Sequence, residues 1–392
     1  MHIDDVSLSF EGGALFLIKR VTTVLLLFAG VLLLFSSSVN ILAADGINVS
    51  AESAVLIEVS GGRVIYEKNA YSRMPMASTT KIMTALVAIE CGDLDRIVSV
   101  SEKAVGVEGS SIYLYPGEKL SMRDLIYALM LESANDAAAA IAISTAGTVE
   151  EFARLMNLKA EEIGLEDTHF ENPHGLDSEQ HYTTAYDLAC LSAYALRNDC
   201  FREIVSTYKR VIPLRDNEGS RVLLNHNRLL RSYDGAIGVK TGFTRKSGRC
   251  LVSSAERDGV TLVSVTLNAP DDWNDHREML DLGFKLFEKL TLCRAGEECF
   301  ELPSVSGDKS FFRASNREDI SVVVEKADRK IRKVAELKRF YYAPISVGDT
   351  VGRVCYYDGD RFLCAVDIVA EEEVTAVKKM NFWEYILSLF RR

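Results

Sequence analysis

The stretch that organises this chain reads Met76-Ala77-Ser78-Thr79-Thr80-Lys81 and continues as an apolar, helix-forming run to Glu90, with Gly92 as the stop. Ser78 is expected at the start of this helix, close to its N-cap. Lys81 follows three residues later, so both side chains lie on one helix face within hydrogen-bonding distance. The sequence therefore predicts a serine and a lysine held side by side.

A serine hydroxyl is a poor nucleophile and needs a neighbouring base. Lysine can be that base only when it is neutral. Its reference pKa is ~10.4, so a neutral Lys81 at neutral pH needs a pKa lower by about 3, at a cost of ~4 kcal/mol. Burial and a second cation are the available means, and Lys240 could be that cation.

A second short motif, Ser133-Ala134-Asn135, falls between helical stretches expected at Met122 to Met130 and Asp136 to Ser144. A turn there can point both polar side chains into a cleft. Ser133 could relay a proton to a leaving amine, and Asn135 could hold a substrate amide. The alternative is a simple turn or N-cap for the helix that begins at Asp136.

The third motif is Lys240-Thr241-Gly242-Phe243-Thr244, on a strand expected from Val239 to Thr244. Alternation puts Lys240, Gly242 and Thr244 on one face. Gly242 lets a substrate backbone approach closely, while Lys240 and Thr244 offer a cation and a hydroxyl to a carboxylate. The Phe243 N–H could join that of Ser78 as an oxyanion hole. The alternative is a strand-edge lysine followed by a turn.

Each motif also has copies elsewhere, so a single match carries little weight. The copies are Ser206 to Lys209 and Ser306 to Lys309 (S-x-x-K), Ser38 to Asn40 (S-x-N) and Lys246 to Gly248 (K-S-G). Strand-like residues follow Ser206, and Ser306 sits in a Gly-Asp turn. These copies lack the helix start that the Ser–Lys pair requires.

The order of elements predicts an α+β fold, in which an antiparallel sheet is covered by helices. A hairpin is expected from Ala54 to Glu67, then a helical tract. That tract includes Thr148 to Ile163, which has a capping box and a Gly164 stop, and Ala185 to Leu196. Strands return at 239–244, 248–255 and 260–267, before a final helix at 273–289. From about Cys293 short alternating strands predict a small all-β domain.

Composition and both chain ends indicate export. The 392 residues suffice for two domains, and a net charge of −11 argues against a nucleic-acid partner. Lys19-Arg20, an apolar run from Val21 to Phe35 and small residues up to Ala44 are typical of a signal peptide, with an uncleaved anchor as the alternative.

No His/Cys pattern typical of a metal site and no phosphate loop is present, so no cofactor is expected.

The last segment, Lys378 to Arg392, places Phe382, Tyr385, Ile386, Leu389 and Phe390 at helical spacing between basic pairs. Such a helix suits the headgroup boundary of an anionic bilayer; the alternative is a helix packed on its own domain. The expected domains are 1–44 (signal), 45–292, 293–376 (all-β) and 377–392 (anchor).

Eight cysteines in an exported chain permit disulfides without requiring them. Cys355 and Cys364 flank a tight-turn signal. If Gly359-Asp360 form a two-residue loop, the two cysteines lie opposite each other and could be bridged. Cys293 and Cys299 are a second possible pair.

These motifs make the chain similar to exported D-alanyl-D-alanine carboxypeptidases, the low-molecular-mass penicillin-binding proteins. The resemblance covers most of residues 45–376 and rests on Met76 to Lys81, Glu132 to Asp136, Asn172 to Asp177, Gly238 to Thr244, and Ala343-Pro344-Ile345 with Gly348-Asp349.

The resemblance implies a transpeptidase-like catalytic domain with Ser78 as nucleophile, Lys81 as base and Ser133 and Asn135 as second motif. It further implies that Lys240 and Thr241 bind a terminal carboxylate. His174-Gly175-Leu176-Asp177 also resembles a family hallmark, with His174 structural rather than catalytic.

The expected activity is removal of the terminal D-Ala from peptidoglycan pentapeptide stems at the outer face of the bacterial cytoplasmic membrane, with β-lactams as inhibitors. The alternatives are a class A-like β-lactamase and a non-catalytic penicillin or wall sensor. Against the lactamase, no E-x-x-L-N run follows the second motif, and Ala134 stands in place of Asp. Transpeptidation or endopeptidase activity also remains open.

Overall fold

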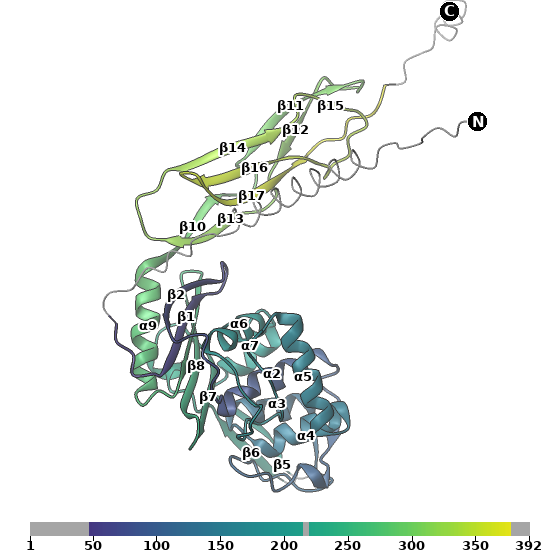
Figure 1. Ribbon diagram of the computed structural model, residues 1–392. Coiled ribbons are helices and arrows are strands. Elements are labelled where there is room, and N and C mark those ends of the chain that lie inside the picture. Colours follow the sequence, from purple (N-terminus) through teal and green to yellow (C-terminus); the bar gives the residue numbers. More distant parts are fainter. Residues whose placement is uncertain (1–46, 215–218, 378–392) are drawn as a thin grey trace, which may run out of the picture. The chain divides into compact units, whose positions relative to one another are not determined.

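The computed structural model describes residues 47–214 and 219–377, which form a helix-plus-sheet region followed by an all-β region (Figure 1). The expected signal peptide and the terminal amphipathic helix lie outside these residues. Within the described part of the chain, no helix is both long and apolar enough to cross a membrane.

The first region is built on a five-stranded antiparallel sheet in the order β2-β1-β9-β8-β7. Its strands are β1 (Ser53–Glu58), β2 (Arg63–Lys68), β7 (Ala236–Thr244), β8 (Gly248–Arg257) and β9 (Val260–Leu267). The expected hairpin and returning strands are thus present. Because β7 is an edge strand, one of its sides is left open to the helices and to a ligand.

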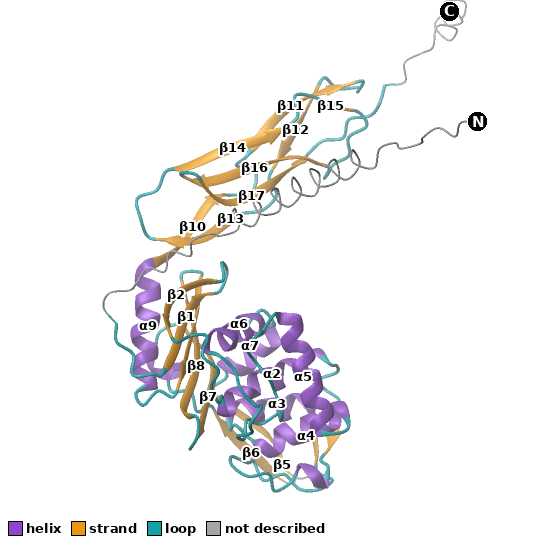
Figure 2. Cartoon of the chain, in the orientation of Figure 1, coloured by secondary structure: helices purple, strands orange, loops and turns teal. Residues whose placement is uncertain are grey.

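Helices cover both faces of this sheet, with α9 on one face and the main helical cluster on the other (Figure 2). The α-helices are α2 (Lys81–Glu90), α3 (Met122–Leu131), α4 (Asn135–Ala146), α5 (Val149–Ile163), α6 (Ala185–Ala195), α7 (Asp199–Ser206), α8 (Leu229–Ser232) and α9 (Asp272–Leu286). The final helix ends three residues before the expected Lys289, because a strand begins at Phe287.

Short elements complete this region. They are the 3-10 helices η1 (Ala77–Thr80) and η2 (Glu102–Ala104), the pair β3 (Ile97–Ser99) and β4 (Lys119–Ser121), and the hairpin β5 (Lys209–Leu214) and β6 (Gly219–Leu224).

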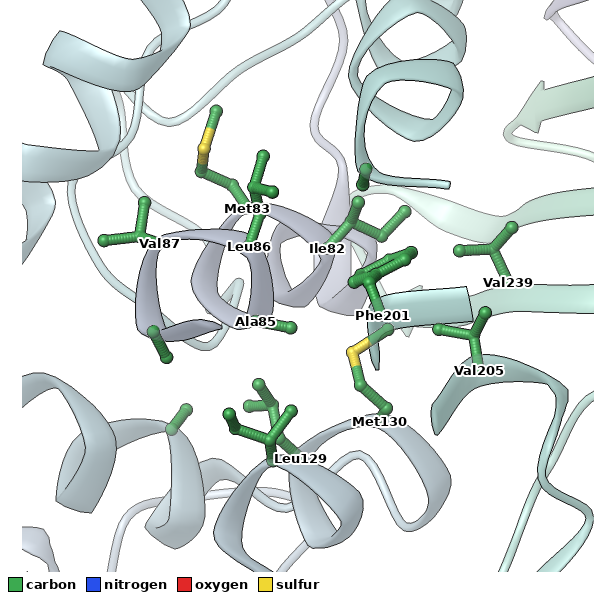
Figure 3. Close-up of a cluster of buried hydrophobic side chains, with 14 of the residues drawn as sticks. Ile82, Met83, Ala85, Leu86, Val87, Leu129, Met130, Phe201, Val205 and Val239 are labelled. Atoms are coloured by element: carbon green, nitrogen blue, oxygen red, sulfur yellow. The ribbon is translucent and has the colours of Figure 1, made fainter. Parts of the chain in front are cut away.

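Helix α2 lies at the centre of the main core. Figure 3 shows Ile82 beside Phe201 of α7, with Val239 of β7 and Met130 of α3 in the same buried cluster. Eight of the ten α2 residues are buried, Lys81 among them. A helix enclosed on all sides has little freedom to shift, so its first turn is a firm support for reactive groups.

The second region contains a six-stranded sheet in the order β14-β16-β17-β12-β11-β15 and the pair β10-β13. The strands are β10 (Phe287–Cys293), β11 (Cys299–Val305), β12 (Phe311–Ser315), β13 (Ile320–Glu325), β14 (Ile331–Leu337), β15 (Tyr341–Tyr342), β16 (Thr350–Asp358) and β17 (Arg361–Ala370). The α+β fold with a C-terminal all-β domain is therefore confirmed.

The expected register of the β16–β17 hairpin is wrong. Cys364 lies opposite Tyr356 rather than Cys355, because an irregularity between Tyr356 and Tyr357 shifts the pairing. All eight cysteines are free, including Cys293 and Cys299, so neither possible bridge is formed.

Candidate active site

The amine of Lys81 is held by three oxygen atoms at the start of α2. Its Nζ lies 2.9 Å from Ser78 Oγ, 2.7 Å from Asn135 Oδ1 and 2.5 Å from the His174 carbonyl oxygen. A neutral amine has two N–H groups and one lone pair. Asn135 and His174 offer only acceptors to it, so in the neutral state the lone pair is left for the Ser78 hydroxyl proton. The arrangement thus orients Lys81 as a base toward Ser78.

The surroundings of Lys81 favour that neutral state. Its side chain is fully buried, and burial lowers its pKa well below the ordinary value. The positive charge of Lys240 lowers this pKa further, while Asp136 opposes the shift as the smallest of the three influences. A buried lysine beside a second cation is the setting in which an amine can accept a proton near neutral pH.

Ser78 sits on a constrained turn. Ala77, which precedes it, has a positive φ of 48°, a conformation that costs a non-glycine residue energy. The Ala77 carbonyl oxygen accepts a hydrogen bond from Thr80 Oγ1 at 2.8 Å. Gly175 packs against the same carbonyl so closely that a Cβ there would lie 1.9 Å from the oxygen. The turn is therefore braced from within η1 and from a distant segment.

A buried histidine extends this brace. His181 Nδ1 accepts a hydrogen bond from the Glu171 N–H at 3.0 Å, which leaves its Nε2 as the donor to Thr80 Oγ1 at 2.8 Å. Burial lowers the pKa of His181 to about 4, so the ring is neutral at physiological pH. Sequence reasoning gave no role to Thr80, which fills a variable position of the first motif, or to His181, which lies outside the short motifs.

The second motif forms the turn between α3 and α4. Ser133 has a positive φ of 59° and is buried, and Asn135 opens α4. The N-cap of α4 is Ala134, which has no capping side chain, so the alternative role of Ser133 as a cap does not apply. Asn135 is held between Lys81 and the Glu108 carbonyl, to which its amide donates. In the described residues the Ser133 side chain forms no hydrogen bond to Ser78 or Lys81.

The loop that carries Glu108 is fastened to α4 by Asp136. This buried carboxylate accepts hydrogen bonds from Ser111 Oγ at 2.6 Å and from the Leu114 N–H at 3.0 Å. An Arg221–Glu118 ion pair holds the end of the loop against the β5–β6 hairpin. The position of the loop that bonds Asn135 thus depends on Asp136, to which sequence reasoning gave no role.

The third motif lies on the edge strand β7. Lys240 is buried, its Nζ donates to the Thr241 carbonyl at 2.8 Å, and burial lowers its pKa to about 7. A Cβ on Gly242 would lie 3.0 Å from the Ser78 nitrogen and 3.2 Å from Ala77 Cβ. Glycine therefore lets the strand pass directly beside the Ser78 backbone, as a shared oxyanion site requires.

The end of the third motif is tied to the segment from Asn172 to Asp177. Thr244 Oγ1 donates to Asp177 Oδ1 at 3.0 Å. The Pro173 carbonyl accepts from Thr84 Oγ1 of α2 at 2.6 Å. Phe243, on the opposite strand face, is 66% exposed. The hallmark segment thus joins the first motif to the third.

His174 contributes its backbone carbonyl oxygen, rather than its ring, to the contacts of Lys81 Nζ. Its ring Nδ1 accepts from the Leu176 N–H at 3.3 Å, and burial, with Lys81 nearby, lowers its pKa to about 3. A ring that stays neutral and holds a local turn is consistent with a structural histidine.

The described copies of the motifs lie elsewhere and are engaged differently. Ser206 and Lys209 are exposed, and Ser206 Oγ donates to the Glu203 carbonyl. Lys309 pairs with Glu372 in the all-β region, and Ser247 bonds Thr244. Among residues 47–214 and 219–377, no group of His, Cys, Asp or Glu is arranged to hold a metal ion.

A buried lysine beside a partly exposed serine, an Asn on a facing turn and a Lys-Thr-Gly edge strand define a serine acyl-transferase. The chain matches the D-alanyl-D-alanine carboxypeptidase family model at residues 39–271 and the C-terminal domain model of penicillin-binding protein 5 at residues 287–376. It belongs to this carboxypeptidase family, and it is a serine-type D,D-carboxypeptidase of the penicillin-binding protein class.

Individual relatives agree with this assignment. The D-alanyl-D-alanine carboxypeptidase DacF of Bacillus subtilis is 33% identical over 94% of this chain and 97% of its own length. The structure of penicillin-binding protein 5 from Haemophilus influenzae aligns with a TM-score of 0.66 at 26% identity, covering 85% of this chain and all (100%) of that one. The Streptomyces K15 DD-transpeptidase aligns with a TM-score of 0.58 at 32% identity, over 61% of this chain and 99% of its own.

Proposed function

We propose that Ser78 attacks the carbonyl carbon of the penultimate D-Ala of a peptidoglycan pentapeptide stem. Lys81 accepts the hydroxyl proton as the Ser78 Oγ–carbon bond forms. The peptide bond then breaks, the leaving amine takes a proton, and free D-Ala departs. Water attacks the resulting ester, the proton it loses returns through Lys81, and Ser78 is regenerated.

The observation that carries this proposal is the set of contacts around Lys81 Nζ. Two of its three close partners, Asn135 Oδ1 and the His174 carbonyl, can only accept hydrogen bonds. A neutral lysine therefore directs its lone pair to Ser78 Oγ, 2.9 Å away. Burial and the charge of Lys240 supply the neutral state.

The developing oxyanion is proposed to lie between the backbone N–H groups of Ser78 and Phe243. The close passage of Gly242 beside the Ser78 nitrogen supports this assignment. Lys240, Thr241 and Thr244 are proposed to bind the terminal carboxylate of the substrate. A charged Lys240 also keeps Lys81 neutral, so one residue would serve both binding and activation.

Ser133 is proposed to pass the proton from Lys81 to the departing amine. It shares a turn with Asn135, whose side chain contacts Lys81 directly. Asn135 keeps its amide bonded to the loop at Glu108, so it is proposed to position both Lys81 and the substrate amide.

Release of free D-Ala from a peptide ending in D-Ala-D-Ala tests this function. We expect wild-type protein to release D-Ala and the Ser78→Ala variant to release none and to take up no labelled penicillin. Ser206→Ala, which alters an exposed serine of the same motif pattern, is the matched control and should behave as wild type. Penicillin labelling that persists in Ser78→Ala would overturn the nucleophile assignment.

Transfer to an amine is a second candidate reaction, favoured by the likeness to a protein named DD-transpeptidase. The acyl-enzyme can react with an amine in place of water. Adding a peptide with a free amino group to the same assay would reveal a transfer product. Hydrolysis alone would restrict the activity to carboxypeptidation, whereas a stable acyl adduct without D-Ala release would favour the sensor alternative.

The enzyme is proposed to act outside the cytoplasm, on the outer face of the membrane. Residues 1–44 would direct export, and residues 377–392 would hold the protein at the bilayer as an amphipathic helix. Aromatic and aliphatic residues at helical spacing between two basic pairs in that segment support this placement. Comparing the membrane and soluble fractions of cells that carry a chain ending at residue 377 would test it.

A further inference from the structure

One end of the all-β region exposes a cluster of large apolar side chains. Tyr342 is 68% exposed and Phe340 is 47% exposed, and their rings meet edge to face with centroids 5.5 Å apart. We call this cluster the aromatic patch. Its members are Val305, Phe311, Phe340, Tyr342 and Val377.

Strand register places these side chains together. Val305 lies directly opposite Tyr342 in the parallel β11–β15 pair, and Phe311 lies opposite Pro303, two residues before Val305. Side chains two residues apart on a strand share a face, so Val305 and Phe311 project to the same side.

The residues next to these in the sequence point into the core of the all-β region. Phe312 and Tyr341 are buried and pack edge to face, with ring centroids 5.6 Å apart. Alternation therefore turns the neighbouring aromatic residues, Phe311, Phe340 and Tyr342, away from the domain core.

Basic side chains border the aromatic patch. Lys338 and Arg339 directly precede Phe340 and line, with Tyr342 and Pro344, a cavity of about 500 Å³. Three nearby carboxylates are engaged within the domain. Asp349 accepts from the Ser346 N–H at 2.7 Å, Asp308 binds Thr375, and Glu372 pairs with Lys309.

The chain leaves the domain at this same end. The Val377 N–H donates to the Ser306 carbonyl, next to Val305, at 2.9 Å. The following residue begins the segment Lys378 to Arg392, in which five large apolar residues at helical spacing lie between Lys378-Lys379 and Arg391-Arg392. The aromatic patch is thus one residue away from the segment proposed to bind the bilayer.

We propose that the aromatic patch is a second membrane contact, seated in the headgroup boundary of an anionic bilayer. Tyr and Phe side chains beside Lys and Arg are the combination that this boundary favours. A single weak anchor gives marginal, reversible attachment, and a second contact makes it stable. The inference rests on the proposed membrane placement of residues 378–392, which would deliver the patch to the surface.

Vesicle sedimentation tests the proposal with the exported chain, residues 45–392. The vesicles contain phosphatidylglycerol and phosphatidylcholine. The test variant is Phe340→Ser with Tyr342→Ser, and we expect it to bind about tenfold more weakly than wild type, since both rings lose their apolar contact with lipid. Phe362→Ser is the matched control, because Phe362 is 54% exposed at the β16–β17 turn and should not contact lipid.

A third variant, Phe382→Ser with Phe390→Ser, separates the two contacts. If it alone loses binding, the terminal anchor stands and the aromatic patch is not a membrane contact. If only the patch variant loses binding, the anchor proposal fails and the patch stands. We expect both to weaken binding.

Isolated peptidoglycan provides the remaining comparison. Loss of sedimentation with peptidoglycan but not with vesicles in the patch variant would identify a glycan partner and overturn the proposal. Thermal unfolding and penicillin labelling of every variant check that the fold is intact. If the double variant unfolds, Tyr342→Ser alone, at the most exposed position, replaces it with a smaller expected loss.

Discussion

Two stretches of the described chain read S-x-x-K within the helix-plus-sheet region, and they differ entirely in surroundings. Lys81 is fully buried, held by three oxygen atoms beside Ser78, with a lowered pKa. Lys209 is exposed on strand β5, and Ser206 ends helix α7 with its hydroxyl on a backbone carbonyl. Burial and neighbouring charge, rather than the spacing of Ser and Lys, therefore create a reactive pair.

Replacing Lys81 should have the largest effect. Lys81→Met removes the base while keeping the volume of the side chain, and general base catalysis contributes about 10²–10⁴-fold to a rate. We expect D-Ala release and penicillin acylation to fall by that factor. Lys209→Met is the control and should leave both rates unchanged; an equal loss in the two variants would show that the effect is not specific to the buried pair.

Replacing Lys240 should have the next largest effect. Lys240→Gln removes the cation proposed to hold the carboxylate, and we expect KM for a peptide with a free carboxylate to rise by about 100-fold. It also removes a charge that lowers the pKa of Lys81, so the rising limb of the pH–rate profile should move to higher pH. Equal losses on free and amidated peptides would show that carboxylate binding is not its role.

Gly175→Ala should disturb the turn that carries Ser78. A Cβ there would overlap the Ala77 carbonyl, and φ is +90°. We expect acylation to fall by about tenfold, with a loss of stability of more than about 1 kcal/mol. Gly164→Ala is the control, since its φ is +84° and a Cβ would meet open space. That variant should lose stability alone, and matching acylation rates in the two variants would contradict the bracing role of Gly175.

The smallest expected effect is the pH dependence of kcat/KM in the wild-type enzyme. Because Lys81 must be neutral, kcat/KM rises as pH increases through its lowered pKa. Because Lys240 must be charged to bind a carboxylate, kcat/KM falls as pH rises above its pKa of about 7. We expect a bell-shaped plot of kcat/KM against pH for the peptide with a free carboxylate. For an amidated peptide, measured as release of D-Ala amide, the falling limb should be absent. A falling limb that is the same for both substrates would assign it to another group.

Much of the site could be predicted from the sequence, because its groups come in short motifs whose local geometry is fixed. A Ser and a Lys three residues apart at a helix start must face one another, and a Lys-Thr-Gly strand must alternate. The α+β fold followed from the order of helical and strand-like patterns. Whether Cys355 lies opposite Cys364 could not be predicted, because one irregularity in a strand shifts every later residue pair.

The sequence by itself determined that Ser78 and Lys81 lie one turn apart, that Lys240 lies on a strand, and which class of chemistry these motifs permit; the expected N-cap at Ser78 is wrong, because Ser78 lies within the 3-10 helix η1 and α2 begins at Lys81. Only the tertiary structure decided which of the two S-x-x-K lysines is buried, and it brought Gly175, His181 and Asp136 to the Ser78 site from distant segments. The physical reason is that hydrogen-bonding geometry within a few residues is set locally. A lysine pKa, in contrast, depends on burial and charge contributed by the whole fold.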